Sequence, residues 1–373
     1  MLSSSPSVPN SAPVIIIGGG PAGAAVAITL SRRGIRSVVL ESRSGPELKV
    51  GECLPPTANP LLDRLGLTEH LRQAGHLISH GNRSAWGSST PTENAFLFSP
   101  YGSGWHLDRR EFEATLAERA REEGADWRYG WRLKGCTRQD GIWLLQANTP
   151  DGEMHLEAGF LVDATGRAAR LARQLGERQI RYDRLVGAAT LMEPRASDAS
   201  KDSFTLVEAV ASGWWYSSRL PSGDLMAAYF TDNDLLNHRA ARKTESWLAL
   251  LAETDHTWNR VRQGDHRPRR EPVILPANTA RLSRIAGADW LAVGDAAVAY
   301  DPLSSYGISS ALGAGFGAGN AIADQLAGDA DAIPKYVTII DRAFQRYLAL
   351  CRDHYAIEQR WPDEPFWLRR RAT

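Results

Sequence analysis

The chain has 373 residues, of which 43% are hydrophobic, enough to bury a sizeable core and to form two or three domains. Its 43 lysine and arginine residues balance 43 acidic residues, which argues against nucleic-acid binding over the whole surface. The three cysteines form no CxxC pair, so neither a disulfide framework nor a metal site is predicted, and a cytoplasmic protein is expected. The early apolar run at 14–17 is too short to span a membrane.

The first elements of the chain form a predicted βαβ unit. Residues 1–12 are rich in serine, proline and asparagine and are predicted to be a flexible tail. Residues 13–17 are typical of a buried strand, residues 22–33 of an alanine-rich helix, and residues 37–40 of a second strand. Together they have the size of one βαβ unit.

The turn between the first strand and the helix reads Gly-Gly-Gly-Pro-Ala-Gly, a GxGxxG motif. Gly18 permits a tight turn, Gly20 lets the backbone approach a pyrophosphate, and Gly23 allows close packing of helix and strand. A pyrophosphate would then lie on the N-terminus of the helix, where free N–H groups favour an anion. Glu41 ends the second strand and can accept both ribose hydroxyls. The motif predicts a dinucleotide site without separating FAD from NAD, and its place near the start of the chain favours FAD.

The middle of the chain changes from helical to strand-like patterns. A loop is predicted over 46–60, helices over 61–74 and 109–123, and strands over 134–138, 142–147 and 156–162. The Asp140-Gly141 turn is typical of a hairpin. Residues 186–280 read as alternating strands with one helix near 239–252, and they predict a second, antiparallel layer. A strand is expected over 290–293, and helices over 307–326 and 335–360.

These patterns predict an α/β fold, with a Rossmann-type FAD-binding domain, an inserted, mainly antiparallel β-sheet substrate domain and a C-terminal helix. The FAD-binding domain would be discontinuous, comprising residues 13–78, 101–185 and 281–334. The substrate domain would comprise residues 79–100 and 186–280. Residues 335–373 would form the C-terminal helix and tail.

Two later segments favour flavin. Residues 163–166, Asp-Ala-Thr-Gly, and residues 294–297, Gly-Asp-Ala-Ala, each follow a predicted strand. An aspartate at the end of a strand can bind a ribityl hydroxyl, while the next helix N-terminus faces the flavin. Each alone is an ordinary strand-to-turn aspartate, but the two together with the glycine turn indicate an FAD site.

With these motifs the chain resembles, over nearly its whole length, the flavin monooxygenases related to p-hydroxybenzoate hydroxylase and the tryptophan halogenases. Further matching segments are 50–52 and Asp108-Arg109, and Gly51-Glu52 with the following prolines resembles the flavin strap of the halogenases. The resemblance implies that Arg109 binds FAD, that Asp295 holds the ribityl chain, and that residues 302–308 pass beside the isoalloxazine. The residues expected to bind FAD are Gly18, Gly20, Ala22, Gly23, Glu41, Arg109, Asp163, Gly166, Gly294, Asp295, Pro302, Gly307 and Ile308.

Halogenation is disfavoured because these enzymes use a lysine, beyond the strap, to handle hypohalous acid. The present sequence has no lysine between Lys49 and Lys134, and Arg83 lies in the corresponding region. Arginine stays protonated and is a poor nucleophile. The Trp-x-Trp-x-Ile-Pro motif of halogenases is misspaced at 213–221, and Ser-Tyr-Gly at 305–307 replaces their Ser-Thr-Gly.

Within the family, residues 51–56, 301–305 and 358–361 resemble flavoproteins that modify tryptophan in a partner enzyme to make quinone cofactors. This implies a monooxygenase that hydroxylates an electron-rich aromatic substrate, a small molecule or a tryptophan in a partner protein, through a C4a-hydroperoxide of FAD. Electrons would come from NAD(P)H or from reduced flavin supplied by a reductase. The alternatives are a halogenase, a flavin reductase of the geranylgeranyl-reductase type, and an FAD-containing maturation factor.

The expected catalytic residues are Glu52, His106 and Tyr306. Glu52 is an acid in the strap, for which a catalytic or gating role is expected. His106 precedes the arginine expected to bind FAD and is either a proton shuttle or a structural histidine. Tyr306 replaces the threonine of the halide site. The tryptophans at 214 and 215 and the tyrosine at 216 are the best candidates for an aromatic substrate pocket.

Overall fold

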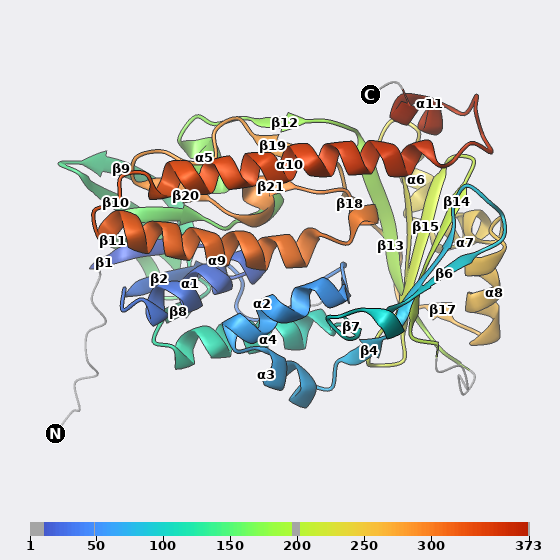
Figure 1. The fold of residues 1–373 in the computed structure, drawn as a ribbon, viewed down its shortest axis with the longest axis horizontal. Coiled ribbons are helices and arrows are strands. Elements are labelled where there is room, and N and C mark those ends of the chain that lie inside the picture. The colour runs from blue at the N-terminus through green and yellow to red at the C-terminus, as the bar shows by residue number, and fades with distance from the viewer. Residues whose placement is uncertain (1–10, 48, 196–201, 372–373) are drawn as a thin grey trace.

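The computed structural model describes residues 11–47, 49–195 and 202–371, and it contains two large sheets, one in each half of the molecule (Figure 1). The strands of the first sheet are β1 (Ser11–Ile17), β2 (Ser37–Glu41), β8 (Asp126–Tyr129), β9 (Arg132–Gln139), β10 (Ile142–Thr149), β11 (Gly152–Asp163) and β20 (Trp290–Ala292). Their order is β8-β2-β1-β11-β10-β9, with β20 also pairing with β11. Strands β8, β2, β1, β11 and β20 are parallel, whereas β9 and β10 form an antiparallel hairpin. The β-branched run of β1 is buried, as expected for a parallel strand.

Helices α1 (Pro21–Arg32) and α9 (Gly307–Leu326) pack against each other because two glycines of α9 leave room for the α1 backbone. A Cβ atom at Gly315 would lie 2.3 Å from the carbonyl oxygen of Ala22, and one at Gly319 would lie 2.6 Å from Cβ of Thr29. The contacts follow the same order along both helices, so α1 and α9 run parallel. Their first turns therefore face the same side of the molecule.

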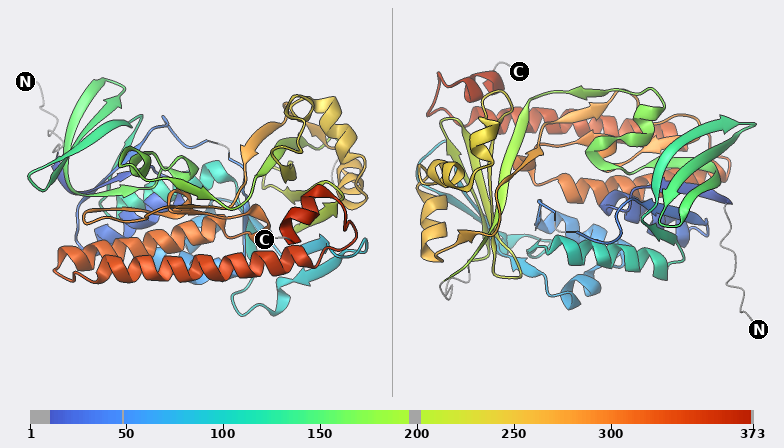
Figure 2. Two further views of the ribbon diagram at one scale, coloured as in Figure 1. Left: turned by 90° about the horizontal axis from the view of Figure 1, so that it is seen from above. Right: turned by 180° about the vertical axis from the view of Figure 1, so that it is seen from behind.

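The second sheet is mainly antiparallel. Its strands are β5 (Gly81–Ala85), β6 (Thr92–Ala95), β13 (Leu185–Glu193), β14 (Phe204–Val210), β15 (Gly213–Arg219), β16 (Leu225–Asp232), β17 (Arg267–Pro268) and β18 (Val273–Pro276). Their order is β17-β13-β16-β15-β14-β5-β6, with β18 also pairing with β13, and only the β14–β5 pair is parallel. Helices α6 (His238–Ala241), α7 (Thr244–Leu251) and α8 (His256–Gln263) lie at its outer side (Figure 2).

Two small sheets, further helices and 3-10 turns complete the fold. Short strands β3 (Cys53–Leu54), β7 (Gly104–His106) and β4 (Leu77–Ser79) form one small sheet, and β12 (Gln179–Arg181), β19 (Ala280–Leu282) and β21 (Val298–Ala299) form another. The other helices are α2 (Asn59–Leu65), α3 (Thr68–Gln73), α4 (Arg109–Glu122), α5 (Arg170–Gln174), α10 (Ala332–Ala356) and α11 (Pro365–Arg371). The 3-10 turns are η1 (Pro56–Ala58), η2 (Phe96–Phe98), η3 (Gly166–Ala168), η4 (Gly294–Ala296) and η5 (Pro302–Ser304).

The predicted α/β fold with an inserted antiparallel sheet and a C-terminal helix is confirmed. Helix α10 runs beside α9 and carries the chain to the second sheet, where α11 lies (Figure 1). In the part of the chain that the structure describes, no helix is long and apolar enough to cross a membrane.

Several predicted boundaries were wrong. The helix expected over 61–74 is two helices, because Gly66 ends α2 in the left-handed conformation with φ of 70°. The single helix near 239–252 is α6 and α7, and α8 was not predicted. Ser11 and Ala12, expected in the tail, belong to β1, while residues 1–10 lie outside the described residues.

Candidate functional site

The glycine turn after β1 has the geometry that the motif predicts. Gly18 has φ of 108°, and a Cβ atom there would lie 2.3 Å from the carbonyl oxygen of Ala164. A Cβ atom at Gly23 would lie 2.0 Å from the carbonyl oxygen of Gly18. At Gly20, by contrast, a Cβ atom would meet no atom of the described residues within 4 Å. Gly18 and Gly23 are therefore required for packing, whereas Gly20 leaves open space at the N-terminus of α1, where a pyrophosphate fits.

Glu41, at the end of β2, lies over the same turn. Its Oε2 accepts a hydrogen bond from the Gly19 amide at 2.9 Å, and its Oε1 accepts one from the Arg43 amide at 2.8 Å. The Trp127 ring closes the space beneath Gly19, since a Cβ atom at Gly19 would lie 2.5 Å from it. The carboxylate is thus fixed beside the turn, in the place expected for an acid that accepts ribose hydroxyls.

Asp163, which ends β11, has both carboxylate oxygens engaged within its own turn. Its Oδ1 accepts hydrogen bonds from the amide and the hydroxyl of Thr165, at 3.0 and 2.7 Å, and its Oδ2 accepts one from the Ala172 amide at 2.8 Å. Gly166 follows with φ of 64°. Residues 163–166 support the glycine turn, since Ala164 packs on Gly18, and a contact between Asp163 and FAD stays a prediction.

Asp295 lies next to the first turn of α1, because Gly294 packs against it. A Cβ atom at Gly294 would lie 2.8 Å from Cβ of Ala22. The Asp295 carboxylate is half-buried and lies 3.4 Å from Nε of Arg167. Desolvation raises the pKa of Asp295, and the charges of Arg167 and Arg109 oppose this shift.

The start of α9 faces the same region. Gly307, its first residue, has open space around the position of a Cβ atom, and Ile308 is buried. Pro302 opens η5, and Ser305 after it has φ of 54°, a strained conformation for a residue other than glycine. The predicted cofactor residues thus gather around the parallel N-termini of α1 and α9.

Arg109, the first residue of α4, holds the backbone at residues 50 and 51, where the strap begins. Its Nη1 donates to the carbonyl oxygens of Val50, at 3.1 Å, and Gly51, at 2.8 Å, and its Nη2 donates to Glu113 at 2.7 Å. Glu113 is also paired with Lys49. Nε of Arg109 is buried and has no hydrogen-bond partner among the described residues. This N–H, the open space at Gly20 and the Glu41 carboxylate together fit an FAD molecule between the strap and α1.

A buried polar cluster joins the strap to the second sheet. We call Glu52, Cys53, His106, Thr205 and Tyr216 the strap cluster. The Tyr216 hydroxyl donates to Oε2 of Glu52 at 3.1 Å and lies 3.1 Å from Sγ of Cys53. The Thr205 hydroxyl lies 3.0 Å from the same sulfur and 3.1 Å from Nε2 of His106. Two of the three predicted catalytic residues, Glu52 and His106, therefore belong to one hydrogen-bonded chain.

Burial governs the ionisation of the strap cluster. Glu52 is 1% exposed, and burial raises the pKa of its carboxyl, an effect opposed by Arg109 and by the Tyr216 hydrogen bond. Burial also raises the pKa of the Cys53 thiol to about 11. It lowers the pKa of His106 to about 4, and the charge of Arg260 acts in the same direction. Cys53 is therefore a neutral thiol at neutral pH, and His106 a neutral imidazole.

His106 is expected to make the protein less stable in mild acid. Because its pKa falls from 6.5 to about 4 on folding, the unfolded chain binds the proton more tightly, and stability is lost as the pH falls from 6.5 towards 4. The loss amounts to about 3 kcal/mol. The free energy of unfolding, measured in urea at several pH values, should fall over this range more steeply in the wild type than in His106→Gln. Parallel curves for the two proteins would contradict a neutral, buried His106.

Tyr306, the third predicted catalytic residue, is separate from the strap cluster. Its side chain is 41% exposed and packs edge to face against Tyr300, with ring centroids 6.4 Å apart. Within the described residues, no hydrogen bond joins it to Glu52 or His106. The geometry therefore groups Tyr306 with the start of α9 and not with the acid of the strap.

The aromatic residues of β15 face opposite sides of the sheet. Trp215 is covered by Trp247 of α7, with ring centroids 5.0 Å apart, so it cannot line a site next to the strap. Trp214 is buried against Phe230, with centroids 4.1 Å apart. Of the three predicted pocket residues, only Tyr216 contacts the strap.

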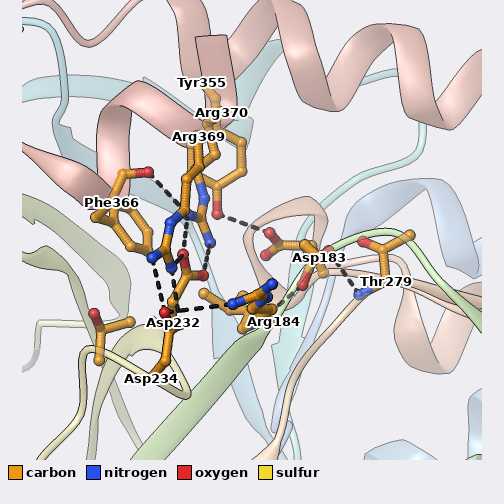
Figure 3. A network of polar contacts seen from close by, with 12 residues as sticks. Asp183, Arg184, Asp232, Asp234, Thr279, Tyr355, Phe366, Arg369 and Arg370 are labelled. Atoms are coloured by element: carbon orange, nitrogen blue, oxygen red, sulfur yellow. Dashed lines mark hydrogen bonds and ion pairs between the residues drawn. The ribbon is translucent and has the colours of Figure 1, made fainter. Parts of the chain in front are cut away.

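The C-terminal arginines form a second network, in a segment that was predicted only as a tail. Figure 3 shows Arg369 and Arg370 beside Asp232, Asp234 and Tyr355. Arg370 donates to Oδ1 of Asp232 at 2.9 Å, and Arg369 donates to Oδ2 of the same carboxylate at 2.9 Å. Arg370 also lies over the Tyr355 ring, 5.0 Å from its centroid. Arg369 and Arg370 carry no local signal for this pairing, because Asp232 lies more than a hundred residues earlier in the chain.

The βαβ turn, the acid after β2 and the aspartate between parallel α1 and α9 define the FAD-dependent oxidoreductases of the halogenase and monooxygenase type. A family model described as "FAD binding domain" matches residues 11–336, and the chain belongs to this family.

Known relatives agree with this class. The putative FAD-dependent oxidoreductase LodB of Marinomonas mediterranea is 30% identical over 361 residues, which cover 96% of each chain. Among solved structures, the myxobacterial chondrochloren halogenase CndH has a TM-score of 0.88 and 22% identity, covering 97% of this chain and 86% of its own. QhpG, a peptidyl tryptophan dihydroxylase essential for tryptophylquinone cofactor biogenesis, has a TM-score of 0.79 and 26% identity, covering 96% and 78%. The predicted halogenase-like family is thereby confirmed.

Proposed function

We propose that the protein is a monooxygenase that hydroxylates an electron-rich aromatic ring, with a tryptophan side chain in a partner protein as its substrate. The observation that carries this proposal is that ion pairs hold Arg83 of β5, which lies in the region where the resemblance implies the lysine of a halogenase. Its Nε donates to Glu93 at 2.6 Å and its Nη1 donates to Asp202 at 2.8 Å, while its guanidinium lies 4.7 Å from the centroid of the Phe204 ring. A protonated side chain held in this way cannot replace a nucleophilic lysine.

Similarity to QhpG, at 26% identity, supports a peptidyl substrate for this chain, and similarity to LodB over the whole length supports an FAD-dependent oxidation. Bound FAD would supply the activation of O₂. The chain would bind the cofactor, orient the ring and exclude water. We propose NAD(P)H, or reduced flavin from a reductase, as the source of electrons.

Within this function, Glu52 would accept the proton that the ring releases when it is hydroxylated. Burial raises the pKa of Glu52, which favours proton uptake, and the Tyr216 hydroxyl donates to the accepting atom, Oε2, at 3.1 Å. Val50, Leu303 and Tyr216 are partly buried and pack against the same hydrophobic cluster, so the hydrogen-bond partner of the acid belongs to an apolar region suited to an aromatic ring.

Replacement of Glu52 by glutamine is expected to lower product formation about 100-fold while FAD stays bound, because the amide keeps the shape but accepts no proton. Glu47→Gln, an exposed change near the strap, is the matched control and should retain full activity. Both variants are assayed by O₂ uptake and by the mass of products formed from indole, phenol and tryptophan peptides. Wild-type product formation in Glu52→Gln would refute the proton-accepting role, and wild-type O₂ uptake without any oxygenated product would refute hydroxylation.

A further inference from the structure

Tyr355 of α10 is a junction between the C-terminal segment, the second sheet and the turn before α9. Its hydroxyl accepts a hydrogen bond from Nε1 of Trp214 at 3.1 Å and donates one to Oδ2 of Asp301 at 2.7 Å. The direction is fixed, because an indole N–H can only donate, so the phenolic proton points to the carboxylate. The ring is held by Arg370, whose guanidinium is itself bound to Asp232 (Figure 3).

Asp301 in turn organises η5. Its Oδ1 accepts a hydrogen bond from the Leu303 amide at 2.8 Å, and its carbonyl oxygen accepts one from the Ser304 hydroxyl at 2.7 Å. The next residue, Ser305, has φ of 54°. A left-handed residue other than glycine costs free energy and persists only where its surroundings hold it. The contacts of Asp301 are therefore what keeps the turn in place at the start of α9.

We propose that Tyr355 is a positioning residue for the flavin, which it serves through Asp301 by holding the η5 turn against the cofactor. This role of Tyr355 rests on the flavin site proposed above. It implies that residues 355–370 help to set the environment of the cofactor. Tyr355 itself touches neither substrate nor flavin in this account. Its hydrogen bond to Asp301 fixes η5 relative to helices α10 and α11.

The charge state of Asp301 gives this arrangement a measurable signal. Burial and the charge of Asp183 raise the pKa of Asp301 to about 6, against the opposing effects of the Leu303 amide, Tyr355 and Arg370. The titratable and charged groups that face Asp301 or its partners are Asp183 before β13, Asp232 of β16, Tyr347, Cys351 and Tyr355 of α10, and Arg370 of α11. A carboxyl that titrates next to η5 should alter the absorbance of bound flavin.

The test is a pH titration of the flavin absorbance in the FAD-bound protein, which needs no turnover. The wild type should show a step with a midpoint near pH 6. Tyr355→Phe should move this midpoint up by about one pH unit, because the carboxylate loses a hydrogen-bond donor. Asp301→Asn should abolish the step.

Tyr347→Phe is the matched control, because it removes a hydroxyl of the same helix that bonds to Asp301 at another atom. The Tyr347 hydroxyl accepts from the Asp301 amide at 2.9 Å, so its loss affects packing but not the carboxylate, and the midpoint should stay in place. Equal midpoints in Tyr355→Phe and the wild type, or a step that persists in Asp301→Asn, would overturn the proposal. Should Tyr355→Phe fail to fold, Asp301→Asn decides the question by the same absorbance step. Loss of hydroxylation alone leaves this titration unchanged, so the two proposals fail separately.

Discussion

Replacing Gly20 by valine is expected to give a folded, colourless protein that binds FAD about 1000-fold more weakly. The glycine turn explains both parts of this result. A Cβ atom at Gly20 meets nothing within 4 Å, so the fold accepts the side chain, but the valine occupies the space where the pyrophosphate approaches α1. Loss of two hydrogen bonds to a charged group costs about 4 kcal/mol, which corresponds to this change in affinity.

Gly135→Val is the matched control, since this glycine also has open space around its Cβ position and lies in β9, away from the turn. It should bind FAD as the wild type does. FAD content is measured by flavin absorbance after gel filtration, and folding by circular dichroism. A yellow, folded Gly20→Val protein would refute the assignment of the turn, whereas an unfolded one would show that Gly20, like Gly18, is required for packing.

Replacement of Asp232 by alanine is expected to lower the free energy of unfolding by about 4 kcal/mol. Asp232 is buried and binds Arg370, which is 9% exposed, so the substitution leaves a cation in the interior without its carboxylate. Arg370→Ala should cost less, about 2 kcal/mol, because Asp232 keeps its ion pair with Arg369 and chiefly packing is lost.

The double variant Asp232→Leu, Arg370→Met tests the physical reason, because replacing both charges by apolar groups removes the unpaired cation. It should recover most of the stability lost in Asp232→Ala. All three variants are compared by urea unfolding. Two outcomes would contradict this explanation: equal losses of unfolding free energy in the two single variants, or a loss in the double variant that equals the sum of the two single losses. Either would show that the ion pair does not hold the C-terminal helix in the way described.

The sequence predicts local elements well where one motif determines them. The turn at Gly18 to Gly23 requires a tight bend, close packing and open space within six residues, and each of these is visible in the residue types. Helix α9 has the predicted bounds, because small residues and a following Ala-Gly pair mark it. The prediction fails at Gly66, since the apolar spacing continues through a glycine that adopts the left-handed conformation.

The candidate site could be predicted only in part, because its contacts cross the chain. Glu52 could be chosen as an acid in the strap, but its partner Tyr216 lies 164 residues later. The same holds for Tyr355 and Asp301, which are 54 residues apart. Conversely, the sequence indicates that Asp163 is a cofactor ligand. Only the structure reveals that both of its carboxylate oxygens accept hydrogen bonds within its own turn. The residue types of the glycine turn indicate the cofactor, whereas the contacts between distant segments decide which acidic side chains surround it.

Whether the protein hydroxylates an aromatic ring or halogenates it is tested most directly by one competition measurement. The FAD-bound protein is supplied with a flavin reductase, NAD(P)H, isotopically labelled O₂, bromide and a tryptophan-bearing partner protein or peptide, and the products are analysed by mass spectrometry. Our account predicts labelled oxygen on the tryptophan ring and no bromine. Brominated tryptophan without labelled oxygen would contradict it.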